Sequence, residues 1–202
     1  LPPSGSGRVR ALIIGIDDYT RVPSLKGAVA DARDFDLTLG RLSVQDRTVL
    51  LDGAATRSAI VAAMTRLDGE SRPGDLVILT LAGHGAREPE RVKGSKPDGF
   101  EEVFILSAFD RSGPGTAERI LSSEIKTWLL ELERRGIDVL FVADTCYGGG
   151  LVRSIDPRAG EISYRTVGDI ELIRDELRPV PVQAQALRDE ADFYRITFVA
   201  AA

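Results

Sequence analysis

The residues with the clearest chemical capacity are a single cysteine, Cys146, and a single histidine, His84. Each follows an apolar run typical of a buried strand, Val139–Ala143 before the cysteine and Leu76–Leu81 before the histidine. Glycines lie close after both residues and forbid simple continuation of either strand. In an open parallel sheet the ligand crevice lies beyond the carboxyl ends of the strands, so neighbouring strands would place thiol beside imidazole. Such a pair forms a nucleophile and its base.

A lone cysteine and a lone histidine also have a structural interpretation. Free cysteine is among the most buried residue types and often acts as a small core hydrophobe. Here both residues lie at the ends of predicted strands, both have glycine neighbours, and the chain has no other candidate for either role. We therefore predict that Cys146 and His84 form a catalytic pair.

Composition limits the remaining classes of protein. The chain has 202 residues, 43% of them hydrophobic, which is enough for one core and favours a single domain. A net charge of −5 argues against a nucleic-acid partner. One cysteine excludes an internal disulfide, which predicts a reducing, cytoplasmic compartment. No apolar stretch approaches the roughly 18 residues of a membrane span, so we predict none.

Strand-like and helix-like segments alternate along the chain as far as the cysteine. Apolar runs predict strands at Val9–Ile16, Arg47–Leu51, Leu76–Leu81, Glu102–Ser107 and Val139–Ala143. Helical spacing predicts helices at Ala28–Leu39, from Thr56 onward, and at Ser122–Arg135 with Ser122 and Ser123 as caps. A polar loop is expected between His84 and Phe100. This alternation predicts an α/β fold with a mainly parallel sheet and helices on both faces.

The two ends of the chain depart from this pattern. We interpret residues 1–8 as a linker remnant and residues 9–202 as one domain. Val152–Asp192 mixes prolines with many charges, which predicts a linker. Tyr194–Ala202 is apolar again and predicts a buried strand. Because a buried strand is an unusual terminus, we expect the chain to be a fragment or a processed subunit, with the C-terminal elements of the fold missing.

Five stretches, in order, resemble the caspase-like cysteine peptidases, and the metacaspases and their bacterial orthocaspase-type relatives more closely than animal caspases. The stretches are R-A-L-I-I-G-I-D-D-Y, L-K-G-A-V-A-D-A-R, L-A-G-H-G, D-G-F-E-E-V-F and A-D-T-C-Y-G-G-G. The resemblance covers about residues 9–150 and returns at I-T-F-V-A-A-A. It implies a three-layer caspase/haemoglobinase-type fold and the activity of a cysteine endopeptidase.

The mechanism that the resemblance implies is peptide-bond hydrolysis through an acyl-enzyme. Cys146 would attack the scissile carbonyl, and His84 would return a proton to the leaving amine. The backbone N–H groups of Cys146 and Gly85 would form the oxyanion hole. No third acidic residue is expected.

Charge predicts the substrate specificity. Animal caspases place a glutamine two residues before the nucleophile in a basic pocket for aspartate, whereas this chain has Asp144 there. In metacaspases the matching acidic residue of the first helix, here Asp31, also lines the pocket, so two carboxylates would receive an Arg or Lys side chain. A strand-end cap for Asp144 and a solvated helix position for Asp31 are the structural alternatives. Ala82 and Ala28 stand where metacaspases commonly have serine and cysteine, which removes polar contacts from the pocket.

Many metacaspases are activated by Ca²⁺ bound to clustered aspartates. The acidic segment involved aligns with I-L-S-S-E-I here, where Ser122 and Ser123 replace the carboxylates, and Arg153 stands where an acidic ligand is expected. Hard cations need several anionic oxygen ligands. We therefore predict no metal, no calcium requirement and no other cofactor. The residual candidate ligands are Asp98, Glu101 and Glu102.

Two other function classes stay open: an inactive caspase-like scaffold or binding module, and an enzyme that uses the thiol for other chemistry, such as group transfer. The Cys/His pair argues against the first, and the lack of a C-x₅-R or C-x-x-C motif argues against the second. Expected partners are protein or peptide substrates with Arg or Lys before the cleaved bond, and further domains or a second subunit of the same precursor. Arginines in the linker predict self-cleavage after Arg158 or Arg165, which no proline follows.

Overall fold

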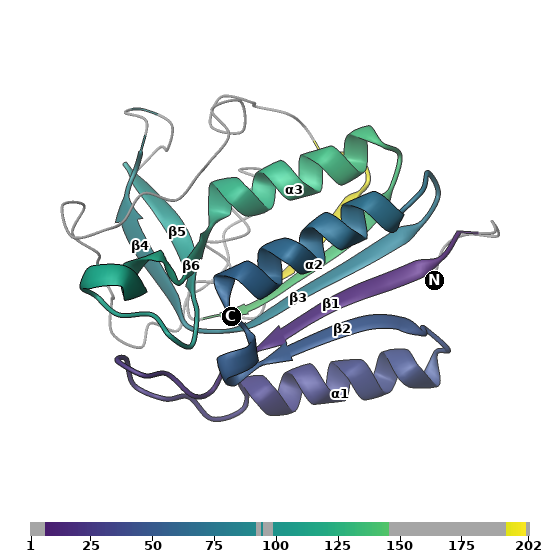
Figure 1. The fold of residues 1–202 in the computed structure, drawn as a ribbon. Coiled ribbons are helices and arrows are strands. Elements are labelled where there is room, and N and C mark those ends of the chain that lie inside the picture. The colour runs from purple at the N-terminus through teal and green to yellow at the C-terminus, as the bar shows by residue number, and fades with distance from the viewer. Residues whose placement is uncertain (1–6, 92–93, 95–98, 146–192, 201–202) are drawn as a thin grey trace.

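The computed structural model describes residues 7–91, 94, 99–145 and 193–200. Its centre is a five-stranded sheet in the order β2-β1-β3-β7-β8, in which all neighbours are parallel (Figure 1). The strands are β1 (Val9–Gly15), β2 (Asp46–Leu51), β3 (Leu76–Gly83), β7 (Asp138–Thr145) and β8 (Ile196–Ala200). The predicted parallel sheet is therefore confirmed, but the buried strand predicted at Tyr194–Ala202 is wrong in burial, since β8 alternates partly buried and exposed residues at the edge of the sheet.

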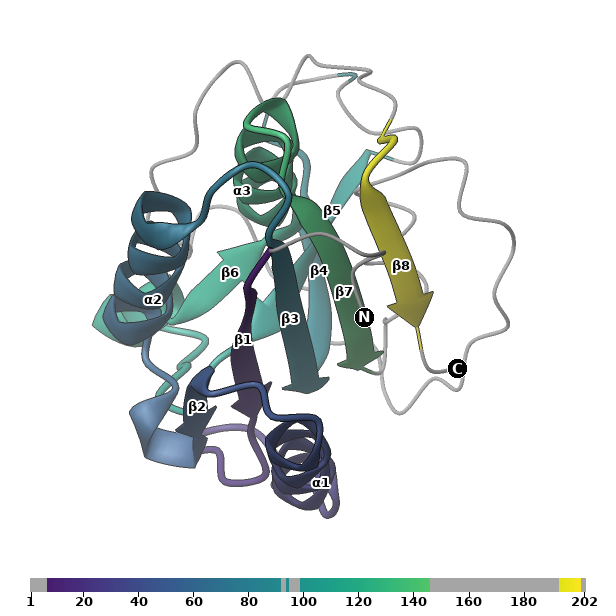
Figure 2. The same ribbon diagram turned by 90° about the vertical axis from the view of Figure 1, so that its right-hand side faces the viewer.

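Helices cover both faces of this sheet, as predicted. Helix α1 (Ala28–Arg41) lies on one face, and helices α2 (Arg57–Glu70) and α3 (Ser122–Arg134) lie on the other (Figure 2). Each crossover from one parallel strand to the next needs a connection that returns over the sheet, and these helices provide it. None of the helices in the described ranges is long and apolar enough to cross a membrane.

Alternate residues of β1 explain how both helical layers are held. Ala11 and Ile13 belong to the core on the α1 side, whereas Leu12 and Ile14 belong to the larger core on the α2 and α3 side. All four side chains are fully buried. A strand buried on both faces has apolar residues in succession, which is the pattern seen in the sequence.

A second, antiparallel sheet of three strands, in the order β4-β5-β6, follows the carboxyl end of β3. Its strands are β4 (Gly85–Pro89), β5 (Phe100–Ile105) and β6 (Arg119–Leu121). The predicted polar loop after His84 is therefore wrong for residues 85–89, which pair with β5. The segment G-A-R-E-P carries no apolar alternation: Glu88 is buried in ion pairs, and the partly exposed Arg87 pairs with Glu102.

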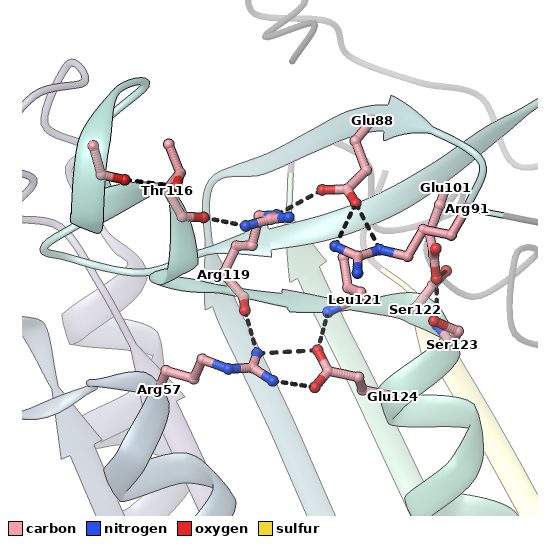
Figure 3. Close-up of polar contacts among 11 residues, drawn as sticks. Arg57, Glu88, Arg91, Glu101, Thr116, Arg119, Leu121, Ser122, Ser123 and Glu124 are labelled. Atoms are coloured by element: carbon pink, nitrogen blue, oxygen red, sulfur yellow. Dashed lines mark hydrogen bonds and ion pairs between the residues drawn. The ribbon is translucent and has the colours of Figure 1, made fainter. Parts of the chain in front are cut away.

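These ion pairs form a buried polar network between the second sheet and the helices (Figure 3). Arg119, which is fully buried, donates through Nε to Glu88 of β4 at 2.6 Å. Arg91 also pairs with Glu88, and Arg57 at the start of α2 pairs with Glu124 of α3. Arg57 further donates to the backbone oxygen of Arg119 at 2.6 Å. Paired in this way, buried charges avoid the large cost of isolated ones, and the second sheet is held against α2 and α3.

The start of α3 corrects a predicted cap. The N-cap position is Leu121, so Ser122 and Ser123 lie in the first turn of the helix and are not its caps. Carboxylates take the role instead: Glu124 accepts from the Leu121 N–H at 2.9 Å, and Glu101 of β5 accepts from the Ser123 N–H at 2.8 Å. A serine pair resembles a helix cap in the sequence, but one of the acceptors here is the carboxylate of Glu101, which lies on strand β5.

The other predicted helix boundaries agree closely with the structure. Thr56 caps α2, since its Oγ1 accepts from the Ala59 N–H at 3.2 Å. Gly136, with φ of 74°, follows the end of α3 in the left-handed conformation that glycine favours. Helix α1 ends at Arg41, two residues beyond the predicted end at Leu39.

Candidate active site

His84 lies where the parallel sheet ends and the antiparallel sheet begins. It directly follows β3, and it is 5% exposed. Its backbone N–H donates to Oη of Tyr19 at 2.8 Å, and its backbone oxygen accepts from the Ile105 N–H at 2.9 Å. Both backbone groups are therefore held by neighbouring elements, which gives the imidazole a defined place.

The imidazole of His84 is oriented by a backbone carbonyl. Its Nε2 lies 2.7 Å from the oxygen of Pro23. A carbonyl oxygen accepts and never donates, so Nε2 carries the proton in this contact. In the neutral ring, Nδ1 is then the basic nitrogen. The contact with Pro23 thus favours the neutral tautomer in which Nε2 carries the proton and Nδ1 does not.

Tyr19 and Pro23, which both contact His84, were not predicted as site residues from the sequence. Tyr19 ends the stretch I-G-I-D-D-Y, one of the motifs that carry the family resemblance, so its place in that motif was an available signal. Pro23 acts through its carbonyl oxygen. Because every residue type has that group, no residue pattern could have identified it.

A pocket of about 420 Å³ opens on the α1 side of the sheet, towards the carboxyl ends of β3 and β7. All three residues predicted to bind substrate line it: Asp31, Ala82 and Asp144. Asp34 adds a third carboxylate, and Phe35 of α1 is among the apolar lining residues. No Lys or Arg is found among the described lining residues. The pocket therefore combines apolar walls with negative charge.

Strand register explains why Ala82 and Asp144 meet. In the β3–β7 pair they are direct partners, and the next pair is Gly83 with Thr145. Partners on adjacent parallel strands point to the same face of a sheet, which here is the α1 face. The predicted adjacency of the histidine strand and the cysteine strand is therefore confirmed.

Helix α1 brings Asp31 to this pocket by packing closely on the sheet. A Cβ at Gly15 would lie 2.5 Å from the backbone oxygen of Ala28, so glycine at this position permits the close approach. The carboxylate of Asp17 accepts hydrogen bonds from the N–H groups of Ala28 and Val29, at 3.0 and 3.2 Å. A carboxylate at a helix N-terminus satisfies free donors and favours the positive end of the dipole. The start of α1, and with it Asp31, is held against the ends of β1 and β3.

Asp144 and Asp31 act as one electrostatic unit. Partial burial, the facing charge of Asp31 and a hydrogen bond between the two carboxyl groups raise the pKa of Asp144. The negative charge of Asp31 therefore opposes ionisation of Asp144. A guanidinium or ammonium group placed between the two carboxylates would pair with both charges.

Several predicted residues lie outside the described ranges: Cys146, Asp98, Arg158 and Arg165. Gly85, predicted for the oxyanion hole, is buried as the first residue of β4. The described neighbour of the cysteine is Thr145, the last residue of β7. The thiol and the oxyanion hole stay predictions.

The two described metal-ligand candidates have protein partners. Glu101 is 1% exposed and accepts from Ser122 Oγ at 3.3 Å, in addition to its bond with Ser123. Glu102 lies 3.5 Å from Nε of Arg87. Within residues 7–91, 94, 99–145 and 193–200, no group of at least three His, Cys, Asp or Glu residues could hold a metal ion. Calcium independence stays a prediction.

The chain is similar to known proteins over most of its length. Residues 9–154 match the family model described as metacaspase, peptidase C14 domain. Metacaspase-3 of Trypanosoma cruzi is 29% identical over 183 residues, which cover 86% of this chain and 47% of that protein. Metacaspase-1 of Pyricularia oryzae is 27% identical over 153 residues, which cover 71% of this chain and 37% of that protein. The chain spans less than half the length of these two relatives.

A solved structure shares the fold. The crystal structure of protein GSU0716 from Geobacter sulfurreducens aligns with a TM-score of 0.57, and the alignment covers 69% of this chain and 50% of that one. The two sequences are 24% identical in this alignment. At this identity the likeness concerns the fold alone.

Proposed function

Because this chain belongs to the metacaspase family, peptidase C14, we propose that it is a cysteine endopeptidase that cleaves peptide bonds after arginine or lysine. One observation carries the specificity: Asp31 and Asp144 line the same pocket at the carboxyl edge of the sheet. The substrates would be proteins or peptides. Aspartate before the cleaved bond would place a third carboxylate against the pair, which like-charge repulsion disfavours.

In the proposed mechanism Cys146 is the nucleophile and His84 is the base. Gly83 and Thr145 are partners on neighbouring strands, and the proposed pair are the residues that follow them. Adjacent strands lie about 4.8 Å apart, and consecutive Cα atoms about 3.8 Å apart, which supports a thiol within reach of the imidazole. Nδ1 accepts the thiol proton, while the Nε2–H bond to Pro23 stabilises the imidazolium that forms.

The reaction then proceeds in two steps. The thiolate sulfur bonds to the scissile carbonyl carbon, and the N–H groups of Gly85 and Cys146 receive the oxyanion. The C–N bond breaks as His84 passes its proton to the leaving amine. Water, deprotonated by His84, next attacks the thioester, which releases the carboxylate product and restores the thiol.

The same specificity would allow the enzyme to process itself. We keep Arg158 and Arg165 as the proposed cleavage sites, since both are arginines in a stretch that is polar and contains prolines. Incubation of the chain and of Cys146→Ala, followed by intact-mass analysis, tests this. New fragments ending in arginine are expected from the unmodified chain alone, whereas identical fragments from both proteins would identify an outside protease.

The proposed function is tested with fluorogenic peptides that differ in one residue before the cleaved bond: arginine, lysine or aspartate. We expect hydrolysis of the arginine and lysine peptides, little hydrolysis of the aspartate peptide, and none by Cys146→Ala. A preference for aspartate would disprove the pocket assignment. A folded chain that cleaves none of the three at any calcium concentration would favour the inactive caspase-like module.

A further inference from the structure

Tyr19 makes two kinds of contact with His84. Its Oη accepts the hydrogen bond from the His84 backbone N–H, and its ring lies against the imidazole, with centroids 4.8 Å apart and planes at 54°. Tyr19 is itself 9% exposed. A buried hydroxyl that accepts from a buried N–H satisfies a donor that would otherwise cost stability.

The end of β3 is shaped around the Tyr19 hydroxyl. A Cβ at Gly83 would lie 2.7 Å from Tyr19 Oη and 3.2 Å from Cε2 of Phe104. Gly83 also has φ of 154°, a value that residues with side chains rarely adopt. Glycine is therefore required at position 83 because the hydroxyl of Tyr19 occupies the space that a side chain would need.

The loop that carries Tyr19 also carries Pro23, so one segment supplies the partner of the His84 backbone N–H and the partner of Nε2. Contacts elsewhere anchor this segment. The Thr20 N–H and side chain both donate to the backbone oxygen of Ser107, at 3.0 and 2.8 Å. Asp52 accepts from the N–H groups of Asp17 and Asp18, each at 2.9 Å. The loop therefore has a position that does not depend on His84.

We propose that Tyr19 is a positioning residue for His84: its hydroxyl and ring lock the histidine against the loop, so that Nε2 meets the Pro23 carbonyl and Nδ1 is the nitrogen that exchanges the proton. This role rests on the proposed function of His84 as the base. Tyr19 acts through His84, and the reaction assigns it no proton of its own.

The chain offers a direct spectroscopic test, because His84 is its single histidine. In protein labelled with ¹⁵N-histidine, long-range ¹H–¹⁵N correlation spectra report which ring nitrogen carries the proton, without interference from other imidazoles. We expect the unmodified chain to show the Nε2–H tautomer. Tyr19→Phe keeps the ring and removes the acceptor, so we expect a mixture of tautomers with broadened ring signals. Tyr194→Phe, which removes a hydroxyl at a site 84% exposed, is the matched control and should leave the spectrum unchanged.

A graded substitution covers the case in which Tyr19→Phe does not fold. Incorporation of 3-fluorotyrosine at position 19 keeps both the ring and the hydroxyl but weakens the oxygen as an acceptor. The same spectral change is expected, smaller in size. An unchanged His84 tautomer in the folded variants would overturn the positioning role.

Kinetics provide the second readout. Because Tyr19 touches the base and not the pocket, Tyr19→Phe should lower kcat about tenfold and change KM for an arginine peptide less than about twofold. A change of about tenfold in KM with an unchanged kcat would contradict the proposal. If the unmodified chain cleaves no peptide, the proposed function fails while the spectra still decide whether Tyr19 sets the tautomer.

Discussion

The pKa of a carboxyl group is shifted in opposite directions at the two ends of the parallel strands, here called the amino edge and the carboxyl edge of the sheet. At the amino edge, Asp75 precedes β3 and accepts from the backbone N–H of Arg8 at 2.7 Å, from that of Arg72 at 2.9 Å and from the guanidinium of Arg10 at 2.6 Å. Burial alone would raise its pKa, but these donors outweigh burial and lower it. At the carboxyl edge, Asp144 faces Asp31, and its pKa is raised.

This difference separates a structural edge from the proposed functional edge. The Asp75 charge is stabilised within the protein, so the folded chain gains from keeping it ionised. The Asp144 charge is opposed within the protein, so the folded chain keeps an electrostatic cost that an incoming cation would remove. Perturbed carboxyl groups in a pocket are typical of binding and catalytic sites. We therefore expect substitutions at the amino edge to change stability and substitutions at the carboxyl edge to change activity.

The largest effect is expected at the proposed catalytic pair. Cys146→Ala and His84→Ala should each reduce kcat/KM for an arginine peptide by at least about 10³-fold, because proton transfer and nucleophilic attack both fail. Cys146→Ser is a matched variant that keeps the shape of the side chain. Thermal unfolding of the cysteine variants should stay close to that of the unmodified chain. Activity near the original level in either alanine variant would contradict the mechanism.

The next largest effect is expected at the amino edge. Asp75→Asn removes the anion that Arg10 and two backbone N–H groups share, which should lower the free energy of unfolding by about 2–4 kcal/mol. Urea denaturation measures this loss. Asp46 also pairs with Arg10, at 2.9 Å, but its side chain is 35% exposed, so Asp46→Asn is the milder control. The activity of folded Asp75→Asn should be nearly unchanged. A large loss of kcat in the fully folded variant would contradict the expectation that the amino edge affects stability and not activity.

A smaller effect on activity is expected from Asp144→Asn. This variant keeps the shape of the pocket and removes one of its charges, so kcat/KM for arginine peptides should fall about tenfold, mainly through KM. The aspartate peptide should become a relatively better substrate because less like charge opposes it. Asp34→Asn tests whether the third carboxylate of the pocket shares this role. Unchanged selectivity in Asp144→Asn would place the specificity elsewhere.

The smallest effects are opposite pH dependences at the two edges. Because the folded-state pKa of Asp75 is lowered, its contribution to stability is complete above the unfolded value and is lost as pH falls below about 4. The pKa of Asp144 is raised, so its folded state holds a proton longer, and stability falls as pH rises through that window. The advantage of the unmodified chain over Asp75→Asn should therefore shrink in acid. Asp144→Asn should instead gain relative stability as pH rises above about 4. Urea titrations between about pH 3 and pH 7 measure both.

Substrate binding should share this window of pH. As pH rises through the pKa of Asp144, its carboxyl group loses its proton and the pocket attracts a cation more strongly. KM for arginine peptides should therefore fall as pH rises, and Asp144→Asn should lose this dependence. A KM independent of pH across the window would argue that the pair is already fully ionised.

Particular residues show where sequence prediction failed. Strand β4 was expected to be a loop because Glu88 is a charged residue that normally faces water, whereas here it is 1% exposed and pairs with Arg119 from another strand. Ser122 and Ser123 matched a capping pattern, but Glu101 and Glu124 supplied the acceptors. In both cases a local pattern was overridden by a partner distant in sequence.

The sequence by itself determined the parallel strands, helices α1, α2 and α3, and three residues of the pocket, but not Asp34 or Phe35. Apolar periodicity reports burial directly, and it is local, so β1, β3 and β7 could be recognised without knowledge of their neighbours. The family motifs then predicted a common pocket for Asp31, Ala82 and Asp144; all three line one pocket, and strand register pairs Ala82 with Asp144. What only the tertiary structure decided is the environment of His84. Tyr19 and Pro23 lie 65 and 61 residues away along the chain, and they act through a hydroxyl and a backbone carbonyl, which follow no periodicity that a sequence displays.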